Sequence, residues 1–369
     1  MTVDSFRFCD ELGPKGVLHI YEPRIGLKAI LVVDNVAAGP SIGGVRIAPD
    51  VSLEECFRLA RAMTLKNAAA GLAHGGGKAV IFGDPAMDAA EKEQVIRAFA
   101  AAVSDVHDFI PGPDMGTNET AMAWVNDEIG RSVGLPRELG GIPLDKIGAT
   151  GFGLAVAADV AKSEARLVLD GARVAVQGFG SVGMHASRRF VERGAVVVAV
   201  ADSSGTVTDP AGLAVEDLIE LKAQGRHVVD YPGGRKLGRD AVIGIDCDIL
   251  IPAARPDAVH MGNVDSVKAT LIVQGANIGV SEDAEQVLHG RGVICLPDFI
   301  SNAGGVICAA VEYHDGTQSQ AFAAIGEKIS ANTAEVLHRA RETGCSLRAA
   351  AVALATDRVR AAMQTRRWA

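Results

Sequence analysis

Three ionisable residues in the first third of the chain, Lys66, Lys78 and Asp114, lie in contexts that suit chemistry on a small charged molecule. Lys66 shares a face with apolar side chains on a predicted helix. Lys78 directly follows three glycines, which allow backbone and ligand to come close. Asp114 lies just past the carboxyl end of a predicted strand, where open α/β sheets usually bind ligands. We therefore treat these residues as a candidate catalytic site.

The chemistry that suits this set is proton transfer beside a bound anion. Two lysines in one dry cleft lower each other's pKa, so one can stay charged on a carboxylate while the other works nearer neutrality. Asp114 beside a cation would stay ionised and could act as a base. Each residue alone also has an ordinary explanation, because Lys66 could extend along an apolar face, Lys78 could be solvated and Asp114 could form a turn.

A second candidate site lies in the middle of the chain. The pattern G-x-G-x-x-G follows a predicted strand at 172–177, opens a predicted helix, and precedes an aspartate at the end of the next predicted strand, 196–201. In that context the glycines permit a tight turn, the approach of a pyrophosphate and close helix packing. The residues expected to bind a dinucleotide here are Gly178, Phe179, Gly180, Ser181, Val182, Gly183, Asp202 and Ser203.

Asp202 determines which dinucleotide we expect. Its carboxylate could accept hydrogen bonds from both hydroxyls of the adenosine ribose and would repel a 2′-phosphate, which favours NAD over NADP. Ser203 and Ser204 follow it, and their hydroxyls could also serve a phosphate. Two alternatives stay open, namely a glycine turn in an α/β fold without a dinucleotide, and Asp202 as a turn-forming residue only.

The elements that position these residues predict an α/β protein of two domains. Strands are expected at 17–22, 27–34, 78–82 and just before 114, and a helix of 52–70 begins with a capping box formed by Ser52 and Glu55. Residues 1–148 would bind substrate, carry the catalytic groups and mediate oligomerisation. Residues 149–339 would form a Rossmann dinucleotide-binding domain. Helical sequence near the end would return, so that about 340–369 completes the first domain.

The composition of the chain makes some classes of binding partner improbable. A chain of 369 residues with a net charge of −9 and no basic run is a poor candidate for binding nucleic acid or an anionic membrane. No apolar stretch is long enough to span a bilayer, and the first residues do not resemble a signal or transit peptide. The six cysteines are scattered without a CxxC pair, which favours reduced thiols, a cytoplasmic location and no metal site.

Six motifs occur in the order seen in one enzyme family. They are Thr64–Leu72 (TLKNAAAGL), Gly75–Lys78 (GGGK), Gly112–Thr117 (GPDMGT), Gln177–Gly183 (QGFGSVG), Gly275–Asn277 (GAN) and Asn302–Gly305 (NAGG). With these motifs the chain resembles the glutamate/leucine/phenylalanine/valine dehydrogenases over nearly its whole length. The resemblance implies reversible, NAD-dependent oxidative deamination of an L-amino acid to a 2-oxo acid and ammonia, by a homo-oligomer.

The resemblance also implies a role for individual residues. Lys66 would bind the substrate α-carboxylate, helped by the backbone near Gly43 and Gly44. Lys78 would polarise the attacking water and the carbonyl or carbinolamine oxygen, while Asp114 would move protons to and from water and the amino group. The family positions expected to contact the nicotinamide, its ribose or the reacting part of the substrate are Thr150, Ala276, Asn277 and Asn302.

Two positions bear on the substrate side chain. Glutamate-specific members carry a lysine and a serine that hold the side-chain carboxylate, and this chain has Ile42 and Ala309 there. Leaving a buried carboxylate unpaired costs several kcal/mol, so an apolar amino acid of the leucine, valine or phenylalanine class is expected. The segment 203–247 looks more like that of glutamate dehydrogenases, and glutamate dehydrogenase is the alternative. A non-catalytic NAD-binding sensor or assembly module is the alternative of another class. His74 is either a pocket-wall residue or a loop histidine.

Overall fold

The computed structural model describes residues 6–366, and the chain divides into two compact units. One unit consists of Met1–Pro143, Val306–Ala321 and Val352–Ala369, and the other of Leu144–Gly305 and Phe322–Ala351. The divisions fall at 143/144 and 351/352, whereas the sequence placed them near 148/149 and 339/340. The return of 306–321 to the first unit is an additional crossing that the sequence analysis did not anticipate.

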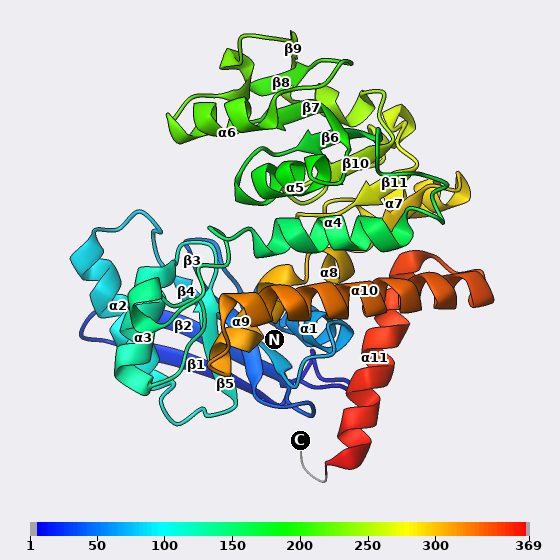
Figure 1. Ribbon diagram of the computed structural model, residues 1–369. Helices are drawn as coiled ribbons and strands as arrows, with labels where there is room; N and C mark the ends of the chain where they lie inside the picture. Colours follow the sequence, from blue (N-terminus) through cyan, green and yellow to red (C-terminus); the bar gives the residue numbers. More distant parts are fainter. Residues whose placement is uncertain (1–5, 367–369) are drawn as a thin grey trace. The chain divides into compact units, whose positions relative to one another are not determined.

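A five-stranded sheet in the order β1-β2-β4-β3-β5 forms the centre of the first unit (Figure 1). β3 runs parallel to β4 and β5, and β2 runs antiparallel to β1 and β4. β3 was not predicted from the sequence, and β4 begins three residues before the predicted strand, because the glycines of both strands resemble loops. The strands are β1 (Gly16–Glu22), β2 (Leu27–Asn35), β3 (Ser41–Ala48), β4 (Gly75–Phe82) and β5 (Phe109–Pro113).

Different helices cover the two faces of this sheet. On one face α2 (Ala89–Ala102) and α3 (Glu119–Ile129) build a core in which Phe99 and Phe109 are fully buried. Burying one such side chain contributes roughly 1.5–3 kcal/mol. On the other face α1 (Leu53–Ala69) packs through Cys56 and Ala60 against Val80 of β4. This second face is the one that carries the candidate catalytic residues.

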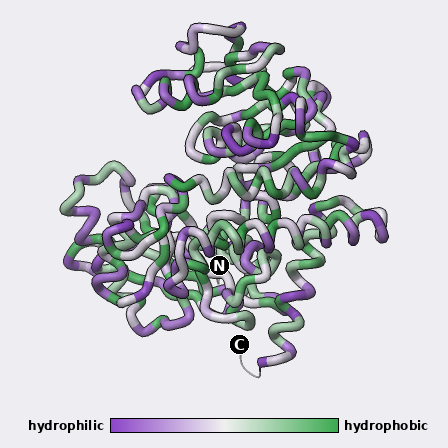
Figure 2. The backbone as a smooth tube through the Cα atoms, viewed as in Figure 1, coloured by the Kyte–Doolittle hydropathy of each residue, from purple (hydrophilic) through white to green (hydrophobic). Residues whose placement is uncertain are grey.

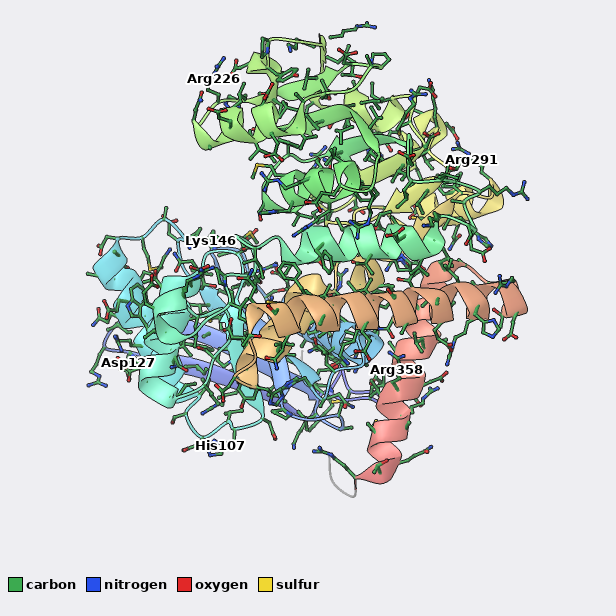
Figure 3. The ribbon with its side chains drawn as sticks, viewed as in Figure 1. His107, Asp127, Lys146, Arg226, Arg291 and Arg358 are labelled. Atoms are coloured by element: carbon green, nitrogen blue, oxygen red, sulfur yellow. The ribbon has the colours of Figure 1, made fainter. Side chains whose placement is uncertain are left out.

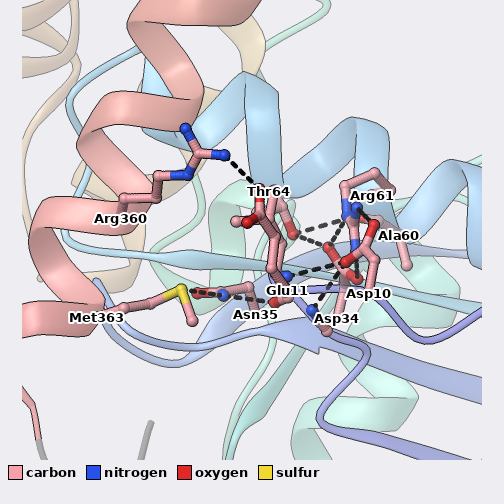
Figure 4. A network of polar contacts seen from close by, with 11 residues as sticks. Asp10, Glu11, Asp34, Asn35, Ala60, Arg61, Thr64, Arg360 and Met363 are labelled. Atoms are coloured by element: carbon pink, nitrogen blue, oxygen red, sulfur yellow. Dashed lines mark hydrogen bonds and ion pairs between the residues drawn. The ribbon is translucent and has the colours of Figure 1, made fainter.

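Ion pairs join the first residues of the described chain to β2 and α1 (Figure 4). Arg61 on α1 donates to Asp10 at 2.6 Å and to the fully buried carboxylate of Asp34 at 2.8 Å. Thr64, one turn further along α1, donates to the same Asp34 at 2.6 Å. A buried carboxylate is stable only when its acceptors are filled, so this network fixes α1 over the sheet.

The helix α11 (Leu347–Thr365) ends in the first unit and holds the carboxyl end of α1. Arg358 (Figure 3) donates to the carbonyl oxygens of Ala68 at 3.2 Å and Ala69 at 2.7 Å. The last carbonyls of a helix lack intrahelical partners, and an arginine both satisfies them and suits the helix dipole. The last turn of α1, which contains Lys66, is therefore tied to α11.

A seven-stranded sheet in the order β12-β11-β10-β6-β7-β8-β9 forms the second unit. The strands from β12 to β7 are parallel, and β8 and β9 extend the sheet in antiparallel pairing. The central strands are hydrophobic along their length, as buried parallel strands require (Figure 2). The strands are β6 (Arg173–Gln177), β7 (Val196–Asp202), β8 (Gly205–Thr208), β9 (Arg235–Leu237), β10 (Ile249–Pro252), β11 (Leu271–Val273) and β12 (Ile294–Leu296).

This topology is that of a doubly wound dinucleotide-binding fold. The chain passes from β6 to β7 on one side and returns to β10 on the other, so the strand order reverses at β6, where such sheets bind ligands. The remaining helices are α4 (Ala149–Ala161), α5 (Ser181–Val191), α6 (Val215–Ala223), α7 (Glu282–Gly290), α8 (Asp298–Ser301), α9 (Gly304–Tyr313) and α10 (Gln318–Thr343). Within residues 6–366, none of the helices combines the length and the apolar character needed to cross a membrane.

Candidate active site

Of the candidate catalytic residues, Lys78 lies on β4 and Asp114 directly follows β5, and β3 lies between these two strands. Side chains alternate along a strand, so Ile42, Gly44 and Arg46 of β3 point to one face of the sheet. The registers of β3 with β4 and β5 place Gly44 beside Lys78 and position Arg46 toward Asp114, which directly follows β5. The chemistry of this unit is therefore concentrated on the face that α1 covers.

Lys78 and Asp114 form a buried ion pair with 2.5 Å between Nζ and Oδ2. Lys78 is 5% exposed, and this burial lowers its pKa, although the charge of Asp114 opposes the effect. Burial alone would raise the pKa of Asp114, but the charge and hydrogen bond of Lys78 hold that pKa below its ordinary value. Asp114 is therefore ionised near neutrality, and the pair can exchange protons with a bound molecule.

Gly44 makes room for this ion pair. A Cβ at Gly44 would lie 2.7 Å from Cβ of Asp114 and 2.9 Å from Nζ of Lys78. The neighbouring Gly43 has another role, because a Cβ there would lie 1.8 Å from the carbonyl oxygen of Gly77. Gly43 thus permits the contact between β3 and β4, whereas Gly44 permits the approach of the Lys78–Asp114 pair to β3.

Sequence analysis missed two charged residues of this site. Arg46 donates from Nε to Oδ2 of Asp114 at 3.0 Å and from NH1 to Oε1 of Glu55 at 2.5 Å. The expected capping box is accordingly only half formed, because the Ser52 hydroxyl accepts from the Glu55 N–H at 3.1 Å while the Glu55 carboxylate binds Arg46. Arg46 lies two residues after Gly44, and in a strand this spacing indicates that both residues lie on the same face of β3.

The remaining expected substrate contacts lie on α1, β3 and α9. Lys66 is half-buried in the last turn of α1. Asn67 beside it donates to the Gly75 carbonyl at 2.7 Å, and its own Oδ1 is buried without a hydrogen-bond partner among the described residues. Ile42 and Ala309 are 3% and 6% exposed and carry no charge. Neither side chain offers a charge to a bound ligand.

His74 is a structural residue in this conformation. It is buried, its Nδ1 lies 3.1 Å from the carbonyl oxygen of Pro40, and its Nε2 lies 3.2 Å from Nε2 of His314. Because a carbonyl oxygen only accepts, Nδ1 donates and Nε2 accepts from His314, which fixes both tautomers. Burial lowers the pKa of His74, so it stays neutral.

Glu312 on α9 is another residue that the sequence analysis passed over. Its carboxylate is buried and accepts three backbone N–H groups, from Gly134 at 2.7 Å, Leu135 at 3.0 Å and Ile142 at 2.7 Å. Burial raises the pKa of Glu312, and the three hydrogen bonds oppose that rise. Glu312 therefore attaches the loop after α3 to the helix that carries Ala309.

In the second unit a cavity of about 410 Å³ opens at the carboxyl ends of β6, β7 and β10, where the strand order reverses. Its lining includes Gly178, Phe179, Gly180, Asp202, Ser203, Lys222, Arg239 and Arg255. The first three residues of the glycine fingerprint and the acidic residue that the sequence indicated thus line one cavity.

The three glycines of the fingerprint differ in backbone conformation and in what an added side chain would meet. Gly178 has a φ of +100°, which few other residues adopt, and a Cβ on Gly183 would lie 2.0 Å from the Gly178 carbonyl oxygen. A Cβ on Gly180 would meet nothing within 4 Å. The protein itself therefore does not require glycine at Gly180, and the open space beside it fits a dinucleotide phosphate at the start of α5.

The other fingerprint residues hold the turn in place. The Phe179 side chain is buried, and its N–H donates to the carbonyl of Ala201 at 2.8 Å. The Ser181 hydroxyl donates to the carbonyl of Asp145 at 2.9 Å. Val182 approaches Gly275, where a Cβ would meet it at 3.1 Å.

Asp202 is saturated by hydrogen bonds from the protein. Its Oδ1 accepts from the N–H and the hydroxyl of Ser204 at 2.9 and 2.5 Å, and its Oδ2 accepts from Lys222 at 2.9 Å and the Val228 N–H at 3.1 Å. Burial would raise its pKa, but the bonds from Ser204 and Lys222 hold the pKa far below its ordinary value. Four donors fill the lone pairs on which the expected ribose contacts depend.

The motifs after β11 and β12 supply further polar atoms in this unit. Asn302 donates to the Gly275 carbonyl at 3.3 Å and to Oδ1 of Asn277 at 3.1 Å. Its own Oδ1 is buried and accepts no hydrogen bond within residues 6–366, which leaves it available to a ligand donor. Ala276 donates its N–H to the Pro252 carbonyl, and Thr150 lies in the first turn of α4.

The matched families decide the identity of the chain. The profile described as Glutamate/Leucine/Phenylalanine/Valine dehydrogenase matches residues 140–367, and that of the Glu/Leu/Phe/Val dehydrogenase dimerisation domain matches 21–131. The chain belongs to the Glu/Leu/Phe/Val dehydrogenase family. The resemblance seen in the motifs and the α/β fold with a Rossmann-type unit are thereby confirmed.

Named relatives of this dehydrogenase include glutamate dehydrogenases. It is similar to the glutamate dehydrogenase of Aeropyrum pernix, with 36% identity over 357 residues, 90% of this chain and 85% of the relative. It is also 36% identical to the NADP-specific glutamate dehydrogenase of Saccharolobus shibatae over 355 residues, 90% of this chain and 83% of that one.

Two solved structures show the same fold. The hetero-hexameric glutamate dehydrogenase of Thermus thermophilus in a leucine-bound form has a TM-score of 0.85 and 31% identity, covering 95% of this chain and 90% of that chain. The L-tryptophan dehydrogenase of Nostoc punctiforme has a TM-score of 0.74 and 26% identity, covering 95% and 97%.

The family membership establishes the general activity. The protein is an amino acid dehydrogenase, an oxidoreductase that acts on CH–NH2 donors with a nicotinamide cofactor. The matched dimerisation domain supports an oligomer. No group of three or more potential metal ligands occurs in the described part of the dehydrogenase.

Proposed function

We propose that the protein catalyses the reversible oxidative deamination of an apolar L-amino acid, of the leucine, valine or phenylalanine class, to the 2-oxo acid and ammonia. The observation that carries the catalytic part of this proposal is the buried contact of Lys78 with Asp114, made possible by Gly44. A lysine of lowered pKa beside an ionised carboxylate suits a reaction that adds water to one carbon and removes an amine.

The proposed roles follow from the charge that each step needs. Lys66 binds the substrate α-carboxylate from the last turn of α1, with backbone groups near Gly43 and Gly44. When bound, the nicotinamide supplies the acceptor for the hydride that leaves the α-carbon. Lys78 then orients the water that adds to the imine carbon and stabilises the resulting oxygen. Asp114 takes one proton of that water and returns it to the amino nitrogen, and the oxygen loses its second proton as ammonia leaves and the carbonyl forms. The α-ammonium loses a proton before the hydride leaves, so the overall reaction yields the 2-oxo acid, ammonium, reduced dinucleotide and one free proton.

Residues of the second unit would hold the dinucleotide. The backbone of Gly178–Gly183 and the start of α5 would bind the pyrophosphate, and Thr150, Ala276, Asn277 and Asn302 would contact the nicotinamide ribose and amide. The partnerless Oδ1 of Asn302 supports this assignment, because a ribose hydroxyl could donate to it.

We infer that the cavity accepts NADP as well as NAD. The sequence expectation of NAD depended on free carboxylate oxygens at Asp202, and those oxygens hold Lys222, Ser204 and backbone donors. Lys222 offsets the negative charge that would repel a 2′-phosphate, and Arg255 lines the same cavity. Lys222→Gln should therefore lower kcat/KM for NADP by about tenfold relative to NAD, a pair effect of about 1.4 kcal/mol.

The control for this cofactor test is Lys162→Gln, which removes a lysine of the same unit that pairs with Asp159 outside the cavity lining. An unchanged ratio of NADP to NAD in Lys222→Gln would contradict the inference. A wild-type enzyme without activity on NADP would restore the original expectation that NAD alone is used.

The preference for an apolar side chain is supported by Ile42 and Ala309. Both are buried in the first unit, and Ile42 shares the face of β3 with Gly44 and Arg46. Two cations on that face, Arg46 and Lys78, are already bound to Asp114. A side-chain carboxylate would thus enter without an assigned partner, at a cost of several kcal/mol.

Glutamate is the second candidate substrate. It is favoured by the relatives, since those at 36% identity are named glutamate dehydrogenases. A glutamate enzyme with this chain would have to bind the side-chain carboxylate with groups other than those at Ile42 and Ala309.

Steady-state kinetics with leucine, valine, phenylalanine, tryptophan and glutamate separate these candidates. We expect kcat/KM for the best apolar substrate to exceed that for glutamate by about a hundredfold. Ile42→Lys should shift the ratio toward glutamate, and Ile42→Leu is its matched control. Preference of the wild type for glutamate would overturn the apolar proposal but not the dehydrogenase activity. Silence across the panel would favour a non-catalytic dinucleotide-binding module.

A further inference from the structure

The carboxylate of Asp114 is held asymmetrically. Lys78 and Arg46 both bond to the same oxygen, Oδ2, at 2.5 and 3.0 Å, and neither bonds to Oδ1. The backbone beneath it is also fixed, because the Asp114 N–H donates to the Thr117 hydroxyl at 2.9 Å, and that hydroxyl lies 2.8 Å from the carbonyl of Val45. Two cations therefore occupy Oδ2, the carboxylate also accepts a hydrogen bond from the Met115 N–H, and Oδ1 keeps acceptor capacity for another partner.

Arg46 is itself fixed by Glu55. The guanidinium uses Nε for Asp114 and NH1 for Glu55, and its side chain is 18% exposed. A guanidinium is planar and carries donors in a rigid fork, so two acceptors on different edges determine its orientation. Lysine could supply the charge but could not hold this bridge. The chain therefore has a four-member array, Lys78, Asp114, Arg46 and Glu55, of alternating charge.

We propose that Arg46, oriented by Glu55, is the positioning residue of the acid–base pair: it holds Oδ2 of Asp114 so that Oδ1 is the oxygen that exchanges protons with the substrate. This proposal rests on the proposed deamination and adds two residues to its machinery. Arg46 acts through Asp114, and Glu55 acts through Arg46.

The array also sets the charge around both titrating groups. Arg46 favours the ionised form of Asp114 and disfavours the protonated form of Lys78, so it lowers the pKa of both. Two ionisable groups of α1, Glu55 and Cys56, also lie against this array. Cys56 lies with its thiol 3.2 Å from the Lys78 carbonyl and has a pKa raised to about 12 by burial, so it remains neutral. The charge of Glu55 opposes that of Arg46.

Replacement of Arg46 tests the proposal through the pH profile of kcat/KM. In Arg46→Gln both pKa values should rise, so both limbs of the profile should move to higher pH by about 0.5–1 unit, a smaller shift than a lone ion pair gives because Lys78 remains. kcat should fall about tenfold or more, while KM for the amino acid changes little. Arg46→Lys keeps the charge and should return the limbs close to their wild-type positions.

Replacement of Glu55 should shift the profile in the opposite direction. Glu55→Gln removes the negative charge beside Arg46, so both limbs should move to lower pH by a few tenths of a unit at low salt. The matched control is Glu54→Gln, because Glu54 is the neighbouring, exposed residue of α1. A merely structural role would lower the amplitude of the profile in these variants without moving its limbs.

Limbs that stay in place in Arg46→Gln, or that move in the same direction in Glu55→Gln, would overturn the proposal. If Arg46→Gln does not fold, Arg46→Lys and Glu55→Gln still test it. Competitive acetylation of Lys78 across pH, read by mass spectrometry, measures its pKa without turnover. A wild type that is inactive on every amino acid but shows the Arg46-dependent pKa would reject the deamination and keep the array, whereas an active enzyme with an unshifted pKa would reject the array alone.

Discussion

Substitution of Gly44 by alanine should disable the enzyme while leaving most of its structure intact. The added Cβ would lie 2.7 Å from Cβ of Asp114 and 2.9 Å from Nζ of Lys78, whereas ordinary contacts begin at 3.4 Å. The ion pair must therefore retreat by at least about 0.5 Å, and a misplacement near 1 Å can cost about a hundredfold in rate. We expect kcat to fall between about tenfold and a hundredfold, with about 1–3 kcal/mol of overpacking.

The assay is the initial rate of reduced nicotinamide formation with the best amino acid, measured together with thermal unfolding. Gly16→Ala is the control, because Gly16 is also a strand glycine and a Cβ there meets nothing within 4 Å. KM for the dinucleotide should be unchanged in both variants. A Gly44→Ala enzyme with wild-type kcat would refute the argument that this glycine exists to admit the ion pair.

Three further substitutions probe other parts of the molecule. Gly180→Ala should leave the free energy of unfolding within about 0.5 kcal/mol of the wild-type value, because a Cβ there meets no protein atom within 4 Å. It should raise the dissociation constant for the dinucleotide at least about tenfold, measured by fluorescence titration, because the ligand needs that space. Arg358→Gln should lower the free energy of unfolding by about 1–3 kcal/mol and raise KM for the amino acid more than it lowers kcat, because two carbonyls beside Lys66 lose their donor. The pKa of His74 is lowered by burial, so its contribution to stability is complete above its ordinary value of 6.5 and is lost as pH falls below it. His74→Asn, which can still donate to Pro40, should flatten the urea midpoint between about pH 7 and 5, and an equally steep loss would assign that stability to other groups.

The sequence was most informative where local patterns repeat. The succession of strand, glycine turn, helix and strand around Gly178–Gly183 predicted β6, α5 and β7 closely, because each element has its own hydrophobic period. β3 could not be found in this way. Its Gly43 and Gly44 permit a backbone contact and a contact with the Lys78–Asp114 ion pair, and both contacts exist only after β4 and β5 have assembled beside it. The glycines therefore resemble a turn until the tertiary structure is known.

In the candidate site, too, residues in local motifs were predictable, whereas contacts that depend on tertiary structure were not. Lys78 and Asp114 were expected in one site from their motifs, and the structure places them in contact, although their roles remain predictions. Arg46 and Glu55 were not expected, because Glu55 had a sufficient local explanation in the capping box. The Asp202 contacts could not be foreseen either, since Lys222 reaches it from a helix that lies 20 residues later in the chain.

The hydrogen bonds between Arg358 and the end of α1 have a consequence for biosynthesis. Its two partners are separated by 289 and 290 positions, so the helix that presents Lys66 emerges from the ribosome long before the arginine that caps it. At synthesis rates of about 5–20 residues per second, the nascent chain waits roughly 15–60 s for that contact. The second unit of a nascent dehydrogenase is thus nearly complete while the end of α1 in the first unit still lacks this contact.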